Sequence, residues 1–419
     1  MDIDVAIVGL GRVGLPLALS FADRGLRTLG IDKDDERVAA VREGRMPFNE
    51  HGGQDVLDRV HAAGTLEVSS SVAEAARARH VVITLGTPSF SHIEIDLRDI
   101  RSVLDDLLPV LEEGHSLILR STVAPGTTDF VAGYLAKKRG FDVGEDLFVA
   151  HAPERIAAGR FFDEIVSLPC IVGGVGSRSG EVVGELFQVF GAPIVQTSPV
   201  QAELAKIWTN ILRYTHFALP NLLMMDCEQY GANVFDVIEL INHDYPRGGM
   251  AQPGLTAGTC LRKDFAFSEE RSHAPGMLLA VSRVNESVPL FLVEGVKRRL
   301  GGLVGRKVAV LGLAFKADTD DERDSLAHKL IRLLERELAD VATHDPVVAS
   351  PTQSFEEAVQ DADAIIVATN HGVFCEPATV QAIRQLAGPE ALIVDPWNCW
   401  GGGQVFTYAP ELTALTAAG

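Results

Sequence analysis

The chain has 419 residues, of which 47% are hydrophobic and 22% are charged. This length exceeds what one compact core supports, so we expect two or three domains of a globular protein. The formal net charge of −20 argues against nucleic acid or anionic lipid as the main partner, because a negative field repels polyanions. A small anionic ligand is still allowed, since it needs only local cations and helix N-termini.

No apolar run reaches the ~18 residues that span a bilayer, so no membrane association is predicted. The first residues, Met1 to Asp4, lack a basic signal-peptide segment and lead directly into an apolar run. The five cysteines are odd in number and widely spaced, which does not indicate a disulfide framework. A reducing cytoplasm therefore fits best, and we predict no metal site.

Apolar, β-rich runs alternate with helical patterns in both halves of the chain. This predicts an α/β fold with two doubly wound, Rossmann-like parallel sheets that helices cover on both faces. The expected strands are 5–8, 28–31, 81–84, 116–119, 147–150, 170–172, 308–311, 341–344, 364–368 and 392–394. A long central helix is expected over 199–230, closed by Gly231. The predicted domains are 1–195 (Rossmann-like), 196–300 (helical) and 301–419 (Rossmann-like).

The first expected strand runs into Gly9, Gly11 and Gly14, and a helical pattern follows. The GxGxxG spacing is weak alone, but between a strand and a helix it is typical of a dinucleotide-binding loop. Asp32 ends the next strand, where a carboxylate accepts hydrogen bonds from ribose hydroxyls and repels a 2′-phosphate. These features predict NAD, in preference to NADP, as the cofactor. The alternative is a glycine turn that binds nothing.

Other residues near this loop complete the predicted cofactor site. Arg37 could lie over the adenine, although a solvated arginine is the alternative. The further cofactor contacts that we predict are Arg12, Val13, Thr87, Pro88, Ser121, Thr122, Lys263 and Arg323.

Cys260 follows a run of small residues and precedes Lys263 and Asp264. Small residues permit close approach of a ligand, and a nearby ammonium favours the thiolate, which is the nucleophilic form. The alternative is a buried, inert cysteine, the commonest fate of this residue. The other four cysteines lack such flanks and are expected only to pack.

Lys206 and Asn210 lie four residues apart on the predicted long helix and therefore share one face. Together they could donate to a developing oxyanion. The alternative is a polar stripe on a surface helix.

Polar residues also follow expected strands at the sheet edge where ligands bind in α/β folds. Thr122 and Glu154 follow two strands of the first sheet. Lys316 follows strand 308–311, where it could meet a nucleotide diphosphate, and Arg323 could also reach a phosphate. That loop lacks GxGxxG, so a second NAD site is not predicted. A solvated charged loop is the alternative.

Taken together, these motifs are more specific than any one of them. The chain resembles the UDP-glucose/GDP-mannose dehydrogenase family over nearly its whole length. The matching pieces, in order, are GLGRVGLPLA at 9–18, PFNEHG at 47–52, STVAPGTT at 121–128, APERI at 152–156, AELAKIWTN at 202–210, the Cys260 segment, LGLAFK at 311–316 and DERDS at 321–325.

The resemblance implies oxidation of the C6 hydroxymethyl of a nucleotide sugar to a carboxylate, with two NAD per turnover. Cys260 would form a thiohemiacetal and then a thioester that water hydrolyses. Lys206 and Asn210 match the family's oxyanion pair, and Asp264 matches the residue beside the water and the thiol. The long helix would form the core of a homodimer or larger oligomer. Further implied contacts with substrate, water or the neighbouring subunit's site are Thr122, Glu154, Arg155, Arg247, Gln252, Gly254, Phe315 and Lys316.

A few single residues and short segments indicate which nucleotide sugar is the substrate. Arg155 and the segments 245–247 and 252–254 resemble members that act on UDP-N-acetylhexosamines, whereas Lys263 resembles the UDP-glucose branch and Trp397 fits neither group. We favour a UDP-N-acetylhexosamine. The alternatives are a UDP-glucose or GDP-mannose 6-dehydrogenase, a two-electron NAD alcohol or hydroxyacid dehydrogenase, and a non-catalytic nucleotide-binding protein.

Overall fold

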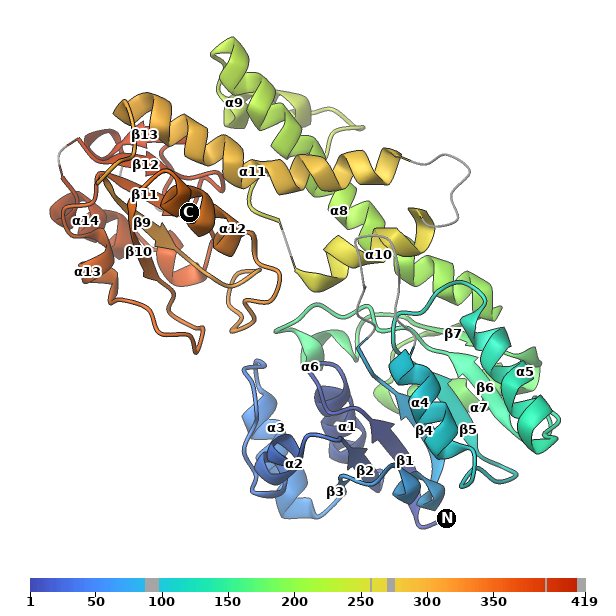
Figure 1. Cartoon of the computed structure of the whole chain (residues 1–419). Coiled ribbons are helices and arrows are strands. Elements are labelled where there is room, and N and C mark those ends of the chain that lie inside the picture. Colours follow the sequence, from blue (N-terminus) through green and yellow to red (C-terminus); the bar gives the residue numbers. More distant parts are fainter. Residues whose placement is uncertain (87–97, 257, 270–275, 389, 413–419) are drawn as a thin grey trace. The chain divides into compact units, whose positions relative to one another are not determined.

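The computed structural model describes residues 1–86, 98–256, 258–269, 276–388 and 390–412. The chain divides into two units (Figure 1). The N-terminal unit comprises Met1–Thr209 and Lys263–Arg271, and the C-terminal unit comprises Asn210–Arg262 and Ser272–Gly419. Each unit contains one sheet flanked by helices, so the predicted α/β class is confirmed. Among the described residues, no helix is long and apolar enough to cross a membrane.

The N-terminal sheet has eight strands in the order β3-β2-β1-β4-β5-β6-β7-β8. The strand order reverses at β1, and such a switch point is where ligands bind in open α/β sheets. The strands are β1 (Ile3–Val8), β2 (Thr28–Ile31), β3 (Leu66–Ser69), β4 (Ala78–Ile83), β5 (Ser116–Leu119), β6 (Phe148–His151), β7 (Cys170–Gly174) and β8 (Ile194–Thr197).

Helices cover both faces of this sheet, because successive residues of each strand point to opposite sides. Val5 and Ile7 belong to the core formed with α1 (Gly14–Asp23), α3 (Gly53–Ala63) and α7 (Gly176–Phe187). Ala6 and Val8 belong to the opposite core, formed with α4 (Arg98–Leu107) and α5 (Thr127–Arg139). Two-sided burial explains why these strands read as continuous apolar runs.

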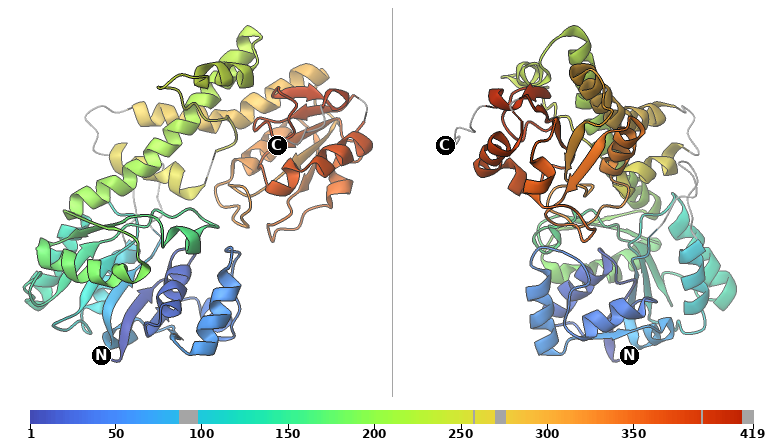
Figure 2. Two further views of the ribbon diagram at one scale, coloured as in Figure 1. Left: turned by 180° about the vertical axis from the view of Figure 1, so that it is seen from behind. Right: turned by 60° about the vertical axis from the view of Figure 1, so that its left-hand side comes forward.

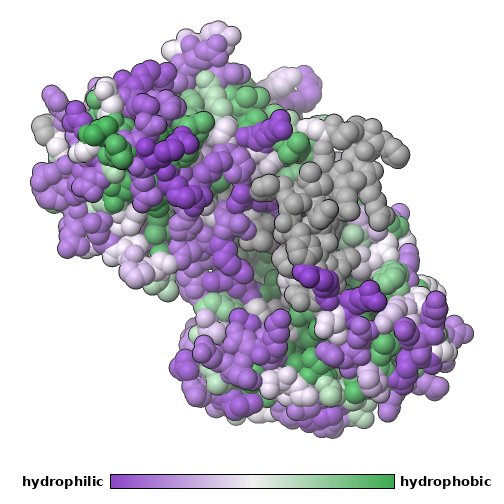
Figure 3. Space-filling model, viewed as in Figure 1, coloured by the Kyte–Doolittle hydropathy of each residue, from purple (hydrophilic) through white to green (hydrophobic). Residues whose placement is uncertain are grey.

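The C-terminal sheet has five strands in the order β10-β9-β11-β12-β13. Helices α11 (Met277–Leu300) and α12 (Leu326–Arg336) cover one face, and α13 (Phe355–Val359) and α14 (Pro377–Leu386) cover the other (Figure 2). The strands are β9 (Lys307–Leu311), β10 (Asp340–His344), β11 (Ala364–Val367), β12 (Leu392–Val394) and β13 (Phe406–Tyr408). On the face drawn in Figure 3, hydrophilic residues cover most of the described surface.

The predicted long helix is confirmed as α8 (Pro199–Tyr230). It has 32 residues and continues through Pro220. The other helices are α2 (Asp35–Arg42), α6 (Phe161–Glu164), α9 (Val234–Asn242) and α10 (Thr259–Glu269).

Both sheets are mainly parallel, as expected, with one antiparallel pair of strands in each. Strand β7 pairs antiparallel with β6, and β13 pairs antiparallel with β12. Parallel pairing needs a crossover that returns the chain to the opposite edge of the sheet. Here the chain turns back along the neighbouring strand: the four-residue α6 and loops join β6 to β7, and a loop joins β12 to β13. The sequence analysis also missed β3, β8 and β13.

The expectation that the other four cysteines only pack is wrong for two of them. Cys375 and Cys399 form a disulfide with a Cα–Cα distance of 4.9 Å. They are 24 residues apart in the chain, and they meet because the loops after the neighbouring strands β11 and β12 leave the sheet at the same edge. This adjacency is a property of the sheet, which cysteine spacing does not reveal.

Candidate active site

The loop after β1 has the geometry of a phosphate-binding turn. Gly9 has a φ of +101°, and a Cβ added to Gly14 would lie 1.7 Å from the carbonyl oxygen of Gly9, so glycine is required at both positions. A Cβ added to Gly11 would meet no atom within 4 Å, which leaves open space above this loop. The first turn of α1 has neither an acidic residue nor a side-chain cap at Val13. Its N–H groups can therefore bind an anion, and the loop fits a dinucleotide.

Asp32 lies at the end of β2, directly beside this loop. Its carboxylate accepts hydrogen bonds from the backbone N–H of Leu10 at 2.6 Å and from the Arg37 guanidinium at 2.9 Å. Arg37 is ion-paired with Asp34 as well, and its side chain is 32% exposed, so its contact with the adenine stays a prediction. The structure thus places the predicted ribose-binding carboxylate against the glycine loop.

Five other predicted cofactor residues have different outcomes. The Arg12 guanidinium lies 5.1 Å from the centre of the Phe48 ring, which brings the 47–52 motif beside the glycine loop. The backbone N–H of Ser121 donates to the carbonyl of Ile83 at 3.2 Å, so the loop after β5 lies next to the end of β4. Thr122, the next residue, is half-buried. The predicted contacts Thr87 and Pro88 lie outside the described residues.

A buried carboxylate that the sequence analysis missed links α8 to the loop after β5. Glu203 is fully buried, and it accepts hydrogen bonds from the N–H of Gly126 at 2.6 Å and from the N–H and hydroxyl of Thr128 at 2.8 and 2.6 Å. Burial raises the pKa of Glu203, and the hydrogen bonds from Thr128 and Gly126 oppose that rise. Lys206 follows one turn later on α8, so this contact holds that turn of the helix on the 121–128 loop.

Glu154, predicted as a catalytic or substrate contact, is buried and ion-paired with Arg120. Its second oxygen accepts from the N–H of Ile156 at 2.7 Å, which tightens the turn after β6. Arg155 donates to the carbonyl of Pro169. Glu154 is therefore oriented by a buried guanidinium, a partner that the sequence motif did not reveal because Arg120 lies on another strand end.

The 47–52 motif also meets the residues that follow the 152–156 motif. Glu50 is buried and accepts from the N–H groups of Gly159 and Phe161 at 3.1 and 3.0 Å. A carboxylate near the start of the chain thus holds the loop that follows Glu154.

Lys206 and Asn210 lie on α8, four residues apart. Lys206 is half-buried and Asn210 is only 5% exposed. A buried amide does not fit the alternative of a polar surface stripe. The pair keeps its predicted role as a donor to an oxyanion.

The Cys260 segment enters α10, of which Cys260 is the second residue. Lys263 and Asp264 follow on the same helix as a buried ion pair, with the ammonium 2.9 Å from the carboxylate. The segment before Cys260 packs closely on aromatic rings. A Cβ added to Gly258 would lie 2.6 Å from the ring of Phe315, and this explains the small residues there.

The loop after β9 corresponds in position to the glycine loop. Its N–H groups, however, are bonded to a carboxylate of the same unit. Asp345, at the end of β10, accepts from the N–H groups of Leu313 and Ala314 at 2.6 and 3.1 Å and from His371 at 3.1 Å. Burial acts to raise the pKa of Asp345, but the hydrogen bonds from His371, Leu313 and Val347 outweigh it and lower the pKa well below its usual range. Lys316 beyond this loop is half-buried, and its contact with a diphosphate stays a prediction.

The remaining predicted substrate and cofactor residues lie at the surface of the C-terminal unit. Arg247 and Gln252 are exposed, and the Arg247 guanidinium lies 4.7 Å from the centre of the Tyr245 ring. Arg323 is exposed and donates to Asp321 at 2.6 Å. Neither arginine is enclosed in a pocket of its own unit.

Comparison with known proteins decides the family. A model of the UDP-glucose/GDP-mannose dehydrogenase family matches the chain in three parts: the NAD binding domain at residues 3–191, the central domain at 200–287 and the UDP binding domain at 309–402. The UDP-N-acetyl-D-mannosamine dehydrogenase of Pyrococcus horikoshii is 33% identical over 377 residues, covering 88% of this chain and 90% of that protein. The chain belongs to the UDP-glucose/GDP-mannose dehydrogenase family.

Solved structures of nucleotide-sugar dehydrogenases agree with this assignment. The UDP-D-ManNAc dehydrogenase of Pyrococcus horikoshii matches with a TM-score of 0.88 at 32% identity, covering 95% of this chain and 96% of that one. The UDP-N-acetyl-mannosamine dehydrogenase of Staphylococcus aureus matches with a TM-score of 0.85 at 30% identity, covering 94% and 95%. A UDP-glucose dehydrogenase from Pyrobaculum islandicum matches with a TM-score of 0.82 at 28% identity, covering 94% of each chain.

Membership confirms the resemblance that the motifs indicated. As a dehydrogenase of this family, the chain is an NAD-dependent oxidoreductase of the nucleotide-sugar dehydrogenase type. The glycine loop and Asp32 lie inside the matched NAD binding domain, and the internally closed loop at Asp345 lies inside the matched UDP binding domain.

The first prediction concerns Asp32. Replacing it by serine removes the negative charge that repels a 2′-phosphate, so the preference for NAD over NADP in kcat/KM should narrow by about tenfold or more. Initial rates of cofactor reduction with each cofactor measure this ratio. Asp34→Ser is the matched control, because Asp34 pairs with the same Arg37 but lies outside the glycine loop. Equal use of both cofactors by the unsubstituted enzyme would contradict the role of Asp32.

Proposed function

We propose that this enzyme oxidises the C6 hydroxyl of a UDP-N-acetylhexosamine to the uronic acid in two NAD-dependent steps, through a thioester on Cys260. The observation that carries the proposal is the position of Cys260 in the first turn of α10, ahead of the buried Lys263–Asp264 pair. A helix N-terminus and a nearby ammonium both favour a thiolate. The matched NAD binding domain and central domain of the family support an NAD-dependent oxidation.

The steps follow from the electron balance. Conversion of an alcohol to an acid removes four electrons, and NAD accepts two electrons as a hydride in each oxidation. The first oxidation gives the C6 aldehyde and releases the hydroxyl proton. The thiolate of Cys260 then adds to the aldehyde carbon, and loss of a second hydride from the adduct gives the thioester. Water cleaves the thioester to the acid and restores the thiol.

The other proposed roles belong to residues of the site. Lys206 and Asn210 would donate hydrogen bonds to the oxygen that gains charge when the thiolate adds. Asp264 would orient the hydrolytic water, and Lys263 would balance its charge. Glu154 and Thr122 would contact the sugar or the water, and the cofactor would lie on the glycine loop.

The second prediction is the stoichiometry and its dependence on Cys260. Two NADH should form for each sugar consumed, with a uronate as product. Cys260→Ala should abolish acid formation, by roughly a thousandfold or more, and leave NAD binding unchanged in calorimetry. Cys170→Ala, which removes a free cysteine of β7, should keep both the rate and the stoichiometry. One NADH per sugar with a released aldehyde would falsify the thioester and favour a two-electron dehydrogenase.

The substrate proposal rests on Arg155 and on the relatives. An arginine after Glu154 adds a hydrogen-bond donor that can serve an acetamido carbonyl. The relatives from Pyrococcus horikoshii and Staphylococcus aureus carry the name of UDP-N-acetylmannosamine dehydrogenases, so UDP-N-acetyl-D-mannosamine is the first substrate to test. The residues Phe315 and Lys316 would hold the nucleotide part, together with Gln252 and Gly254.

The third prediction is the order of substrates. In a panel of UDP-N-acetylmannosamine, UDP-N-acetylglucosamine, UDP-glucose and GDP-mannose, an N-acetylhexosamine should have the highest kcat/KM at a fixed NAD concentration. A tenfold advantage corresponds to ~1.4 kcal/mol of transition-state discrimination. A tenfold advantage for UDP-glucose or GDP-mannose would overturn the substrate proposal and leave the oxidation chemistry in place.

We also propose a homodimer or larger assembly through α8. Large apolar side chains recur every four residues along one face of this helix and are 39 to 55% exposed: Val200, Leu204, Trp208 and Leu212. Exposure of such an apolar row to water is unfavourable, and the row can pack against the same row of a second copy. Arg247 is exposed in its own chain and would complete the neighbouring subunit's site.

The fourth prediction tests this assembly. Leu212→Glu places a charge in the apolar row and should shift the protein toward monomers in sedimentation velocity. Leu240→Glu, at a more exposed position on α9, should leave the assembly unchanged. If the site is shared, mixing the inactive variants Arg247→Ala and Cys260→Ala should restore part of the activity. Absence of restored activity, with subunit exchange verified, would contradict the shared site.

Two further proposals concern organisation and location. We propose the division into an NAD-binding domain at 1–195, a central domain at 196–300 and a UDP-sugar-binding domain at 301–419, which the three matched ranges support. We propose a cytoplasmic location, where NAD is available to accept the hydrides.

A further inference from the structure

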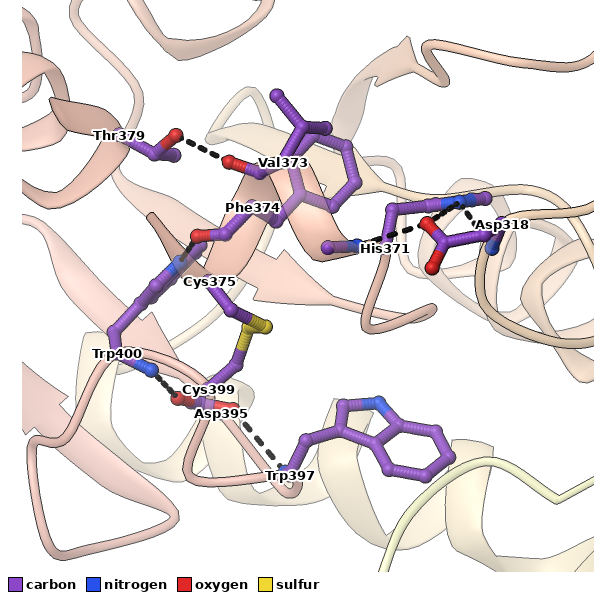
Figure 4. The surroundings of a disulfide bond; sticks show 11 residues. Asp318, His371, Val373, Phe374, Cys375, Thr379, Asp395, Trp397, Cys399 and Trp400 are labelled. Carbon is purple, nitrogen blue, oxygen red and sulfur yellow. Dashed lines mark hydrogen bonds and ion pairs between the residues drawn. A yellow bond between two sulfur atoms is a disulfide. The ribbon is translucent and has the colours of Figure 1, made fainter. Parts of the chain in front are cut away.

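Trp397 lies in the loop that follows β12, and several hydrogen bonds hold this loop in place (Figure 4). The buried carboxylate of Asp395 accepts from the N–H of Trp397 at 3.1 Å and from the N–H of Trp400 at 2.7 Å. The Trp400 indole, fully buried, donates to the carbonyl of Phe374 at 2.8 Å. These contacts hold the loop on the 3₁₀ helix η3 (Gly372–Cys375) that follows β11.

The disulfide adds a covalent link at the same place. Cys375 is the last residue of η3, and Cys399 lies between Trp397 and Trp400 in the chain. The bond therefore joins the loop that carries Trp397 to the neighbouring element, which belongs to the same rim of the C-terminal sheet (Figure 4).

The ring of Trp397 lies against the segment that leads to Cys260. A Cβ added to Gly254 would lie 2.3 Å from Cζ3 of Trp397, so the indole ring packs directly on the backbone there. The N–H of Gly254 donates to the Asn221 side chain at 2.8 Å, which fixes the other side of the segment. The indole N–H of Trp397 is buried and has no hydrogen-bond partner within the part of the chain that the structure describes.

The same segment is held a second time before it enters α10. Gly258 packs on the ring of Phe315, and Gly254 lies six positions before Cys260 in the chain. Two aromatic rings, from the loops after β9 and β12, thus set the path of the backbone that enters the Cys260 helix. A shift of Trp397 would release one of these two supports.

We propose that Trp397 is a positioning residue for the Cys260 segment and that the Cys375–Cys399 disulfide is a redox control on its position. This inference rests on the proposed role of Cys260. A dithiol reductant opens the disulfide by thiol–disulfide exchange. Two electrons and two protons pass to the cysteine sulfurs as the S–S bond breaks, and the reductant becomes a disulfide. The loop then keeps only its hydrogen bonds, and the Gly254 segment loses a fixed support.

The proposed cytoplasmic location bears on the role of the Cys375–Cys399 disulfide. In reducing compartments, disulfides are usually transient and serve catalysis or redox sensing. The Cys375–Cys399 pair lies in the range matched by the UDP binding domain and does not include Cys260, the thiol expected to react with substrate. Sensing is therefore the role that suits it, with the closed disulfide as the more active state.

The fifth prediction compares the two redox states of the full-length enzyme. Treatment with dithiothreitol, with reduction verified by peptide mass after alkylation, should lower kcat/KM for the preferred nucleotide sugar by about tenfold to a hundredfold. The double variant Cys375→Ser/Cys399→Ser should have the low value and should not respond to dithiothreitol. Cys170→Ser is the matched control and should keep the full response.

A second readout does not require turnover. The rate at which iodoacetamide alkylates Cys260, followed on its own peptide well below the melting temperature, should change on reduction. Trp397→Leu should give the same change in the oxidised protein and should respond little to reduction. An unchanged Cys260 alkylation rate and a kcat/KM within about twofold, after verified reduction, would overturn the inference. Acid formation by Cys260→Ala would instead overturn the proposed nucleophile, so the two failures are distinguishable.

Discussion

Burial of both faces of each sheet is the constraint on which the rest of the molecule depends. Val5 and Ile7 point into one core and Ala6 and Val8 into the opposite one, so no face of the sheet is left for a ligand. Polar chemistry is confined to the edge where parallel strands end, and the strand order places the switch point at β1. The glycine loop, Asp32, the 121–128 loop and Glu154 all belong to this edge of the N-terminal sheet.

Buried carboxylates hold the loops at these sheet edges by accepting hydrogen bonds from their N–H groups. Asp32 and Asp345 occupy corresponding places in the two sheets, and each accepts from the N–H of the residue after the first glycine of a β-to-loop turn. Glu203 and Asp395 accept several N–H groups of loops that would otherwise have unsatisfied donors. A carboxylate without such partners would be costly to bury, so each of these acids both requires and stabilises the loop around it.

The buried carboxylates Asp32 and Asp345 lie in different surroundings in the two sheets. In the N-terminal sheet the space above Gly11 stays open, and the first turn of α1 keeps its N–H groups for an anion. In the C-terminal sheet, His371 pairs with Asp345 and closes the corresponding position. One Rossmann-like unit therefore suits a dinucleotide, and the other can offer its outer loop residues, such as Lys316, to a nucleotide diphosphate. The same sheet edge also carries Phe315 and Trp397, whose rings support the segment before Cys260.

Much of this protein could be predicted from its sequence. The continuous apolar strands, the GxGxxG loop with Asp32, and the bounds of α8 follow from local patterns, because side-chain period, glycine spacing and helix-ending signals act over a few residues. The order of the motifs identified the family, and it predicts roles for Cys260, Lys206, Asn210 and Asp264. Those features depend on chain-local chemistry.

Only the tertiary structure decided the partners of these residues. Arg120 meets Glu154, Glu203 meets Thr128, and Glu50 meets Gly159, each across a separation of more than 30 residues that no periodicity encodes. The antiparallel strands β7 and β13 depend on the lack of a crossover helix, and the Cys375–Cys399 bond depends on the adjacency of β11 and β12. Such contacts arise when sheet order brings distant loops to one edge, and this order results from packing the whole chain.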